Sequence, residues 1–528
     1  MWALVQEPCP EKIGQNAAAV PPCPKVRGRW ILAATILGSS MAFIDGTVVN
    51  VALPALQTHL KATAADLQWV VEAYALLLSA FLLVGGSLGD HYGRRRIFVL
   101  GIALFALASA ACGMATNIRQ LILARGFQGF GGALLVPGSL AIISNSFSED
   151  QRGRAIGTWS GLSAMATALG PVLGGWLIEQ ISWRAVFFIN LPLALIVILI
   201  SQRYVHETSD RQSGGIDWLG ASVIALALGA LVYGLIESSR LGLADPFILT
   251  ILIAAAALIL LFVLIETRLA NPMLPLTLFR TPQFTGANLL TFFLYAALGG
   301  TLFFLPLNLI QVQHYSATGA GAALLPFILT ISLVSRWSGG LTQHEGSYLP
   351  LIVGPLIVAS GYLLFTLPGI GGSYWRYFFP PIVLLGLGMA ITIPPLTTLV
   401  MNSVPQDRAG LASGVNNTVA RTAGLIAVAM LGIVMLRVFS RDVDRRLLEW
   451  NIPVSAAEWL QTQRMNLAAV TLPEAMTPHT GQLIRRVVEE SFVSGFRVIM
   501  LIGAGLAGVS AITSAVFIRQ SSSEQAPK

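Results

Sequence analysis

Charged side chains are scarce in this sequence of 528 residues. Only 11% of the residues are Asp, Glu, Lys or Arg, and 55% are hydrophobic, whereas about 25% of a soluble globular protein is charged. This composition excludes a soluble domain and predicts a chain that crosses a lipid bilayer many times. The net charge of +7 would favour a nucleic-acid partner in a soluble protein, but cytoplasmic loops rich in Lys and Arg explain it equally well. We therefore expect no nucleic-acid partner.

Cysteine is rarer still. Cys9, Cys23 and Cys112 form no CxxC pair, so they predict neither a disulfide framework nor a zinc site. None of the four lysines follows a glycine, which excludes a phosphate-binding Walker loop. The pair His206-Glu207 lacks the second histidine of a zinc protease. We expect no metal, no cofactor and no enzymatic activity. Prolines and charges in residues 1–29 also argue against a cleaved signal peptide.

Long apolar runs are abundant. A helix needs roughly 20 apolar residues to cross a bilayer, and the chain offers fourteen such segments. The first six are 30–53, 67–88, 97–114, 121–143, 155–177 and 185–200; two more are 218–236 and 246–265; the last six are 284–310, 319–334, 349–367, 378–401, 410–436 and 498–518. The sequence predicts an all-α polytopic membrane protein with 14 transmembrane helices.

The distribution of Lys and Arg gives the orientation. With the N-terminus in the cytoplasm, the inner segments hold 17 of the 32 basic residues, and the short outer loops hold five. Eight more lie in the segment 437–497, but long loops cross the membrane largely regardless of their charge. Both termini are therefore predicted to be cytoplasmic.

Two parts of the chain repeat each other. The segment 339–346 repeats 86–93 at an offset of 253, and 402–414 repeats 145–157 at an offset of 257. Transporters are often built from such repeats. The sequence predicts a cytoplasmic tail (1–29), a six-helix bundle (30–202), linkers with two inserted helices (203–283), a second six-helix bundle (284–518) with an outer loop at 437–493, and a second cytoplasmic tail (519–528).

A short polar turn connects the second and third predicted helices. It reads Gly-Ser-Leu-Gly-Asp-His-Tyr-Gly-Arg-Arg-Arg from Gly86 to Arg96. Its glycines permit a tight turn, and Asp90 is placed to accept backbone hydrogen bonds or to pair with an arginine. The pattern Gly-x-Leu-x-Asp-x-x-Gly-Arg-Arg, which includes Gly93 and Arg94, resembles the loop between helices 2 and 3 of the major facilitator superfamily of transporters.

Three further stretches resemble the fourteen-helix drug:proton antiporters of that superfamily. They are Asp45-Gly46-Thr47-Val48-Val49-Asn50-Val51-Ala52-Leu53-Pro54, then Leu121-x-x-x-Arg125-x-x-Gln128-Gly129-x-Gly131, and then Gly170-Pro171-Val172-Leu173-Gly174-Gly175. The third resembles a motif of antiporters rather than uptake systems. Four positions before Gly170, where that motif has a glycine, this chain has Ala166. The resemblance covers residues 30–518.

The resemblance also implies roles for these residues. The polar turn would act as a latch on the cytoplasmic side, with Arg94 pairing with Glu149 or Asp150 and with Asp90 facing the start of helix 5 or helix 13. The glycines and Pro171 of helix 5 would lie where the two halves meet and rock. A close helix crossing without any transport role would use the same small residues.

Three ionisable residues lie inside predicted helices of the first bundle, where burial is costly and usually functional. At 1.5 Å per residue, Asp45 lies roughly 12 Å, Glu72 about 8 Å and Arg125 about 6 Å from the outer ends of their helices. The sequence predicts that they meet as a proton-coupling cluster. A structural ion pair, or a Glu72 side chain that reaches toward water, is the alternative.

A substrate cavity is predicted from residues of both halves. Arg421 lies in the middle of helix 13 without a nearby acid, so it would bind backbone carbonyls or an anionic group of the substrate. Phe292 and Tyr295 of helix 9 suit flat apolar compounds, unless they face lipid or the core, and Asn50 belongs to the first-helix motif. The segment 442–490 is expected to cap the outer mouth or to bind a partner protein.

Together with this resemblance, these observations predict a proton-coupled antiporter that exports small amphipathic or toxic compounds by alternating access. Its location would be the plasma membrane, which in a bacterium is the inner membrane. Its partners would be protons, the substrate and the lipid bilayer. One alternative is a transporter of a specific metabolite or siderophore with the same fold. The other is a membrane sensor that does not transport.

Overall fold

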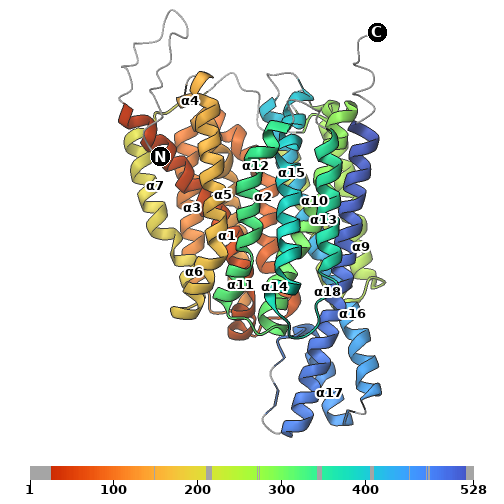
Figure 1. The fold of residues 1–528 in the computed structure, drawn as a ribbon. Coiled ribbons are helices and arrows are strands. Elements are labelled where there is room, and N and C mark those ends of the chain that lie inside the picture. Colours follow the sequence, from red (N-terminus) through yellow and green to blue (C-terminus); the bar gives the residue numbers. More distant parts are fainter. Residues whose placement is uncertain are drawn as a thin grey trace, which may run out of the picture.

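The computed structural model describes residues 25–147, 149–209, 217–269, 272, 274–341, 348–404, 409–450, 452–470, 472–473 and 476–518. Every regular element among these residues is a helix (Figure 1). In chain order the longer helices are α1 (Lys25–Leu60), α2 (Ala64–Tyr92), α3 (Arg94–Met114), α4 (Ile118–Ser146), α5 (Glu149–Gln180), α7 (Asn190–Tyr204), α8 (Trp218–Leu241), α9 (Pro246–Arg268), α10 (Pro282–Leu307), α12 (Leu325–Leu341), α13 (Tyr348–Leu364), α15 (Phe379–Asn402), α16 (Ala409–Glu449), α17 (Val454–Gln463) and α18 (Pro478–Thr513).

Shorter helical pieces extend several of these. They are α6 (Ala185–Phe188) before α7, η1 (Leu276–Arg280) and η2 (Asn308–Val312) on either side of α10, α11 (Ala317–Ala323) before α12, α14 (Tyr374–Tyr377) before α15, η4 (Arg464–Asn466) after α17 and η5 (Ser514–Ile518) after α18.

Helix boundaries follow from local capping. Thr63 starts α2 with a capping box: its hydroxyl accepts from the backbone N–H of Asp66, whose carboxylate accepts from the backbone N–H of Thr63 at 2.8 Å. Asn117 caps α4 in the same way through the backbone N–H of Gln120. Such caps satisfy the free N–H groups of the first turn, so short polar connections suffice between long apolar helices.

Twelve helices of the described chain are long and apolar enough to cross a membrane. They coincide with twelve of the fourteen segments expected from the sequence. The other two expected segments correspond to α5, a helix of 32 residues, and α13, an apolar helix of 17 residues. The polytopic all-α prediction is therefore confirmed, and the count of fourteen spans stays a prediction.

The helices pack in two sets with the same pattern. In the first set, α4 contacts α2 and α3, and both α5 and α7 contact α1. In the second set, α15 contacts α12 and α13, and both α16 and α18 contact α10. The same backbone approaches recur: a Cβ at Gly129 would overlap the carbonyl oxygen of Tyr74, and a Cβ at Gly386 would lie 2.6 Å from that of Phe327. Hereafter the two sets are called the first half (α1–α7) and the second half (α10–α18).

The halves meet mainly in two places. In one, α5 contacts α11 and α12; in the other, α2 contacts α16. The additional helix α8 packs against α2 and α16, at one of these junctions, and α9 packs on α8. Most of α9 is not covered by other helices: only 17% of its apolar stretch is buried inside the protein. That exposure is what a bilayer accommodates and water does not.

Charged helices project from one end of the bundle. The second part of α16, α17 and the first part of α18 form this extension, opposite the end where α1 starts and α18 finishes (Figure 1). Ion pairs join its helices: Arg446 of α16 pairs with Glu490 of α18, and Arg464 of η4 pairs with Asp444 of α16. The segment 437–493, expected as an outer loop, is thus largely helical because its apolar positions pack between these helices.

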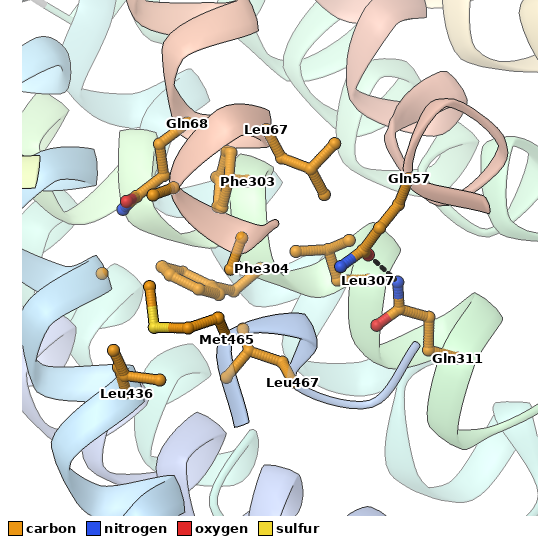
Figure 2. A pocket seen from close by; sticks show the side chains of 13 residues that line it. Gln57, Leu67, Gln68, Phe303, Phe304, Leu307, Gln311, Leu436, Met465 and Leu467 are labelled. Carbon is orange, nitrogen blue, oxygen red and sulfur yellow. Dashed lines mark hydrogen bonds between the residues drawn. The ribbon is translucent and has the colours of Figure 1, made fainter. Parts of the chain in front are cut away.

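The extension folds back onto the bundle. The backbone carbonyl of Asn466 accepts a hydrogen bond from Gln57 of α1 at 3.0 Å, and Gln311 donates to Gln57 at 2.9 Å. Met465 and Leu467 lie against Phe303 and other side chains around a cavity of about 20 Å³ (Figure 2). The extension therefore covers the ends of helices from both halves, the arrangement of a cap.

Candidate functional site

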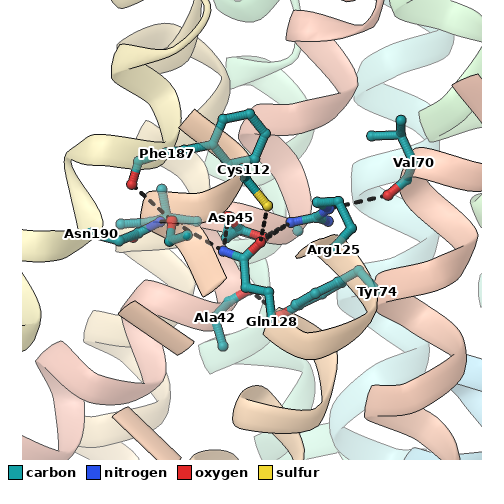
Figure 3. A network of polar contacts seen from close by, with 12 residues as sticks. Ala42, Asp45, Val70, Tyr74, Cys112, Arg125, Gln128, Phe187 and Asn190 are labelled. Atoms are coloured by element: carbon teal, nitrogen blue, oxygen red, sulfur yellow. Dashed lines mark hydrogen bonds and ion pairs between the residues drawn. The ribbon is translucent and has the colours of Figure 1, made fainter. Parts of the chain in front are cut away.

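A buried ion pair lies inside the first half. Asp45 of α1 and Arg125 of α4 are 0% and 1% exposed, and the Arg125 guanidinium binds the Asp45 carboxylate directly (Figure 3). Two charges far from water are stable only when they are paired and their remaining hydrogen-bonding atoms are satisfied. The surroundings of this pair meet that condition.

Gln128 connects both members of the pair. Its side-chain oxygen accepts from Arg125 Nη1 at 2.7 Å, and its nitrogen donates to Asp45 Oδ1 at 2.8 Å. Gln128 also donates to Ser109 of α3 at 3.3 Å, and Asn190 of α7 donates to the same hydroxyl at 3.0 Å. Four helices, α1, α3, α4 and α7, thus fix the carboxylate of Asp45 in one orientation (Figure 3).

The other side of Arg125 faces α2. Its Nε donates to the backbone carbonyl of Val70 at 3.1 Å, and its guanidinium lies 4.3 Å from the ring centre of Tyr74. The Tyr74 hydroxyl donates to the backbone carbonyl of Ala42 at 3.1 Å. Arg125 is therefore held by a carboxylate, an amide, a carbonyl and an aromatic face, a set that favours its charged state.

Glu72 does not join this cluster. It is 1% exposed, but its Oε2 has no hydrogen-bond partner and it forms no ion pair with a described residue. Residues of α2 advance by about 100° each, so Glu72 stands about 200° from Val70 and from Tyr74, which contact Arg125. It lies instead between Trp69 and Leu76, which pack against α8 and α16. The depth of the three residues is similar, but the helix face differs.

The equivalent place in the second half is apolar. Arg125 and Gln128 of α4 correspond, 257 positions later, to Ile382 and Leu385 of α15, and both are buried. Tyr74 corresponds, 253 positions later, to Phe327. The helix packing is repeated without these polar residues, so the Asp45–Arg125 ion pair has no counterpart at the equivalent place of the second half.

In the polar turn, Asp90 pairs with a neighbouring arginine, which is one of the two roles expected for it. Arg94 pairs with Asp90 at 2.8 Å, whereas the side chains of Glu149 and Asp150 lie outside the described residues. Gly93 has φ +113°, and a Cβ there would lie 2.5 Å from the Glu207 carboxylate. That carboxylate accepts from the backbone N–H groups of Arg95 and Arg96 at 3.1 and 3.2 Å. Gly93 therefore leaves room for an acid that caps α3.

Gly86, the first residue of this turn, lies within α2, and a Cβ there would make ordinary contact with Pro137 of α4 at 3.6 Å. Close to the turn, burial and the positive charges of Arg27 and Arg95 lower the pKa of His206. The turn is thus tied to α4 and to the segment after α7.

The glycine-rich stretch of α5 lies between α1 and the second half. Gly170 and Gly174 pack against Thr47 and Val48 of α1, and Gly175 packs against the backbone of Ala317 in α11. The carbonyl of Pro171 lies against Gly321 of α11. Small residues at these positions allow the two halves to contact through their backbones.

The predicted substrate residues occupy separate helices. Asn50 is half-buried on α1 and donates weakly to Gly46 at 3.4 Å. Phe292 and Tyr295 are half-buried on α10. Arg421 of α16 lies close enough to Tyr295 and Tyr74 for its charge to act on both hydroxyls. Within the part of the chain that the structure describes, no hydrogen bond or ion pair joins Asn50 to Tyr295 or Arg421.

Several partners in the site were not expected from the sequence. Ser109 and Asn190 carry no motif, and their role depends on packing between α3 and α7. Glu207 lies in a polar linker, and nothing in the sequence distinguishes it from another acidic residue of that linker. Gln128 offered the clearest signal, because it stands three residues after Arg125 and shares its helix face. Within the described residues, no cluster of three His, Cys, Asp or Glu side chains is placed to hold a metal ion.

Comparison with known proteins identifies similar chains. Residues 35–428 match the family model described as Major Facilitator Superfamily. The multidrug resistance protein Stp of Mycobacterium tuberculosis is 34% identical over 495 residues, which cover 90% of each chain. The tetracenomycin C resistance and export protein of Streptomyces glaucescens is 32% identical over 525 residues, covering 97% of this chain and 96% of the relative.

Solved structures share the fold at low identity. A bacterial homologue of the human lysosomal transporter Spinster, in an inward-facing unoccupied conformation, superposes with a TM-score of 0.66 at 19% identity, covering 94% of this chain and 99% of the other. The POT family transporter PepTSo superposes with a TM-score of 0.64 at 14% identity, covering 96% and 100%. These likenesses concern the arrangement of helices.

Proposed function

Because this chain belongs to the Major Facilitator Superfamily, we propose that it is a proton-coupled antiporter that exports small amphipathic, toxic compounds. We assign it to the fourteen-helix drug:proton branch. The observation that carries the proposal is the buried Asp45–Arg125 pair in a chain whose relatives are named for multidrug resistance and antibiotic export. A buried ionisable residue in a membrane helix is costly and is usually retained for transport chemistry.

Asp45 is the proton carrier in this proposal. Arginine stays charged in proteins, whereas a carboxylate can gain and lose a proton. Protonation of Asp45 would leave Arg125 with Gln128, the Val70 carbonyl and the Tyr74 ring as partners, so the site keeps its shape in both states. One proton enters as Asp45 is loaded from outside, and it leaves to the cytoplasm when the substrate is bound.

Alternating access follows from the way the halves meet. In this conformation the contacts at the extension end join both halves: Glu179 of α5 accepts from the backbone N–H and the hydroxyl of Thr318 in α11, both at 2.7 Å, and Gln68 of α2 donates to the Val428 carbonyl at 2.9 Å. These few polar contacts, with glycine-lined backbone contacts beside them, can separate when the halves tilt. The extension end would be outside the cell, where opening releases the substrate.

Orientation and location complete the proposal. The inner loops carry most of the Lys and Arg, so both termini would be in the cytoplasm and the extension would face outward from the plasma membrane. A cysteine at Ser455, which is exposed on α17, should react with an impermeant thiol reagent added to intact cells. Failure to react in a folded protein would contradict this orientation.

The direct test uses the purified chain in liposomes. An imposed proton gradient should drive the movement of aromatic dyes of different charge, and collapse of the gradient by an ionophore should stop it. Movement of a single metabolite or siderophore, with no dye transported, would favour the alternative of a specific transporter. Binding without movement of any compound would favour a sensor.

A further inference from the structure

Arg421 lies in the middle of the membrane helices, as Arg125 does, but it is half-buried whereas Arg125 is buried. Arg421 makes no hydrogen bond or ion pair with any described residue, and its Nε is buried without a partner. Asn416, five residues before it on α16, already has partners: it donates to Asn288 and Thr291 of α10 at 3.2 and 2.7 Å. The positive charge of Arg421 is therefore uncompensated.

The position of Arg421 is the junction between the halves. Gly414 precedes Arg421 on α16, and a Cβ added to Gly414 would lie 3.1 Å from the side chain of Leu83 of α2. On the other side of Arg421 the Val428 carbonyl accepts from Gln68 of α2. Arg421 thus lies midway along the contact between α2 and α16. Its charge acts on the hydroxyls of Tyr74 on α2 and Tyr295 on α10, which belong to different halves.

Chemistry limits how such a charge can be accommodated. A carboxylate such as that of Glu72, which is buried with its Oε2 unpartnered, can become neutral by binding a proton. Arginine does not lose its proton in proteins, so the charge of Arg421 needs an anion. A guanidinium presents its donors as a planar fork that matches a carboxylate or sulfonate. Tyr74 and Tyr295 add aromatic rings and hydroxyls nearby, and Phe292 stands three residues before Tyr295 on α10.

We propose that Arg421 binds an acidic group of the transported compound, so that the substrates include amphipathic aromatic acids. This inference rests on the proposed function as an exporter and names a substrate class for it. The acid pairs with Arg421, and the apolar body of the compound lies toward the aromatic side chains of α10. Because the residues around the ligand come from α2, α10 and α16, one bound molecule contacts both halves.

The test compares two probes that differ in charge and share one ring system, 9-anthracenecarboxylate and 9-anthracenecarboxamide. The full chain is purified into lipid nanodiscs, with no proton gradient, and binding is followed by energy transfer from its tryptophans. The wild-type protein should bind the acid at least about tenfold more tightly than the amide, as expected for one charged hydrogen-bonded pair. Arg421→Gln should abolish this preference and leave the affinity for the amide unchanged.

Two further variants control the result. Arg437→Gln removes an exposed arginine from the same helix and should leave the preference intact. Arg421→Lys keeps the charge without the planar fork and should retain part of the preference. If Arg421→Gln loses both probes through misfolding, the lysine variant decides: weaker acid binding with unchanged amide binding supports the proposal. Equal affinity of the wild-type protein for acid and amide, or an undiminished preference in Arg421→Gln or Arg421→Lys, overturns it.

The same titration in sodium gluconate and in sodium chloride distinguishes a substrate acid from an inorganic anion. Complete competition by physiological chloride would assign the site to inorganic anions and overturn the substrate class. The exporter function is scored separately, by movement of the amide under a proton gradient. If the amide is moved but the binding of the acid does not depend on Arg421, only this inference is contradicted. If the binding of the acid depends on Arg421 but no compound is moved by the gradient, the exporter function is contradicted.

Discussion

Gly129 in α4 and Gly386 in α15 occupy equivalent places in the two halves, and each lets its helix lie against the backbone of the helix that packs on it. One turn earlier in the same helices the chemistry differs. Arg125 pairs with Asp45 in the first half, whereas Ile382 takes the same place in the second. Helix packing is thus shared between the halves and charge is not. The comparison teaches that the fold needs the glycines, and that the ion pair is retained for something the fold does not need.

The largest effect is expected from breaking the pair on one side. Arg125→Leu makes the first half resemble the second, but it leaves the Asp45 carboxylate buried without an opposite charge, which costs about 3–5 kcal/mol. We expect a lower unfolding temperature in detergent and proton-driven export reduced at least about 100-fold. The matched change Ile382→Leu in the second half should cost less than about 1.5 kcal/mol and leave export intact.

The double variant Asp45→Asn with Arg125→Leu removes both charges and tests the same point from the other direction. It should recover most of the stability that the single arginine change loses, because no unpaired charge remains, and it should still fail to export. Normal export by either variant in well-inserted protein would show that the pair is structural.

The shared packing can be tested by adding one methyl group in each half. Gly129→Ala and Gly386→Ala both place a Cβ against a backbone carbonyl oxygen, so both should destabilise the chain by about 1–3 kcal/mol, as overpacking does. The amount of folded protein from membrane extracts, measured by fluorescence-detected size exclusion, should fall for both. Gly424→Ala on α16, whose Cβ meets nothing within 4 Å, is the control. A large loss for only one of the two glycines would break the proposed equivalence.

An intermediate effect is expected for Gln128→Leu, which copies Leu385 of the second half. The change removes the hydrogen bonds of Gln128 to Asp45 and from Arg125, worth about 1.5–3 kcal/mol each when a charged group is involved. Export should fall roughly tenfold and its pH profile should shift, while the protein stays folded. An unchanged pH profile would mean that Gln128 does not position the carboxylate.

Sequence reasoning reached some of this site and missed the rest for a physical reason. Counting residues from helix ends gives depth, and depth correctly placed Asp45 and Arg125 at one height. Depth carries no information about the helix face, so it could not show that Asp45 pairs with Arg125 while Glu72 stands on another face of α2. Apolar runs located the spans, because a bilayer demands them. The helical extension was hidden, because its charged helices lack such runs and depend on packing with one another.

The smallest effect is therefore expected for Glu72→Gln. Glu72 lies on the face of α2 toward α8 and α16 and has no opposite charge within ion-pair distance among the described residues. An amide of the same size replaces the carboxyl group, so we expect export within about twofold of wild type, since substitutions that conserve shape cost least. Loss of proton-driven export in this variant would return Glu72 to the coupling site.

The central claim, that the proton is carried by the pair in the first half, is tested most directly by proton release on substrate binding. Purified protein in detergent, in weakly buffered solution with a pH-sensitive dye, receives a compound that the liposome assay has identified as a substrate. We predict release of protons by the wild-type chain and by Glu72→Gln, and none by Asp45→Asn, with substrate binding retained in all three. Release that persists in Asp45→Asn and disappears in Glu72→Gln would contradict the account.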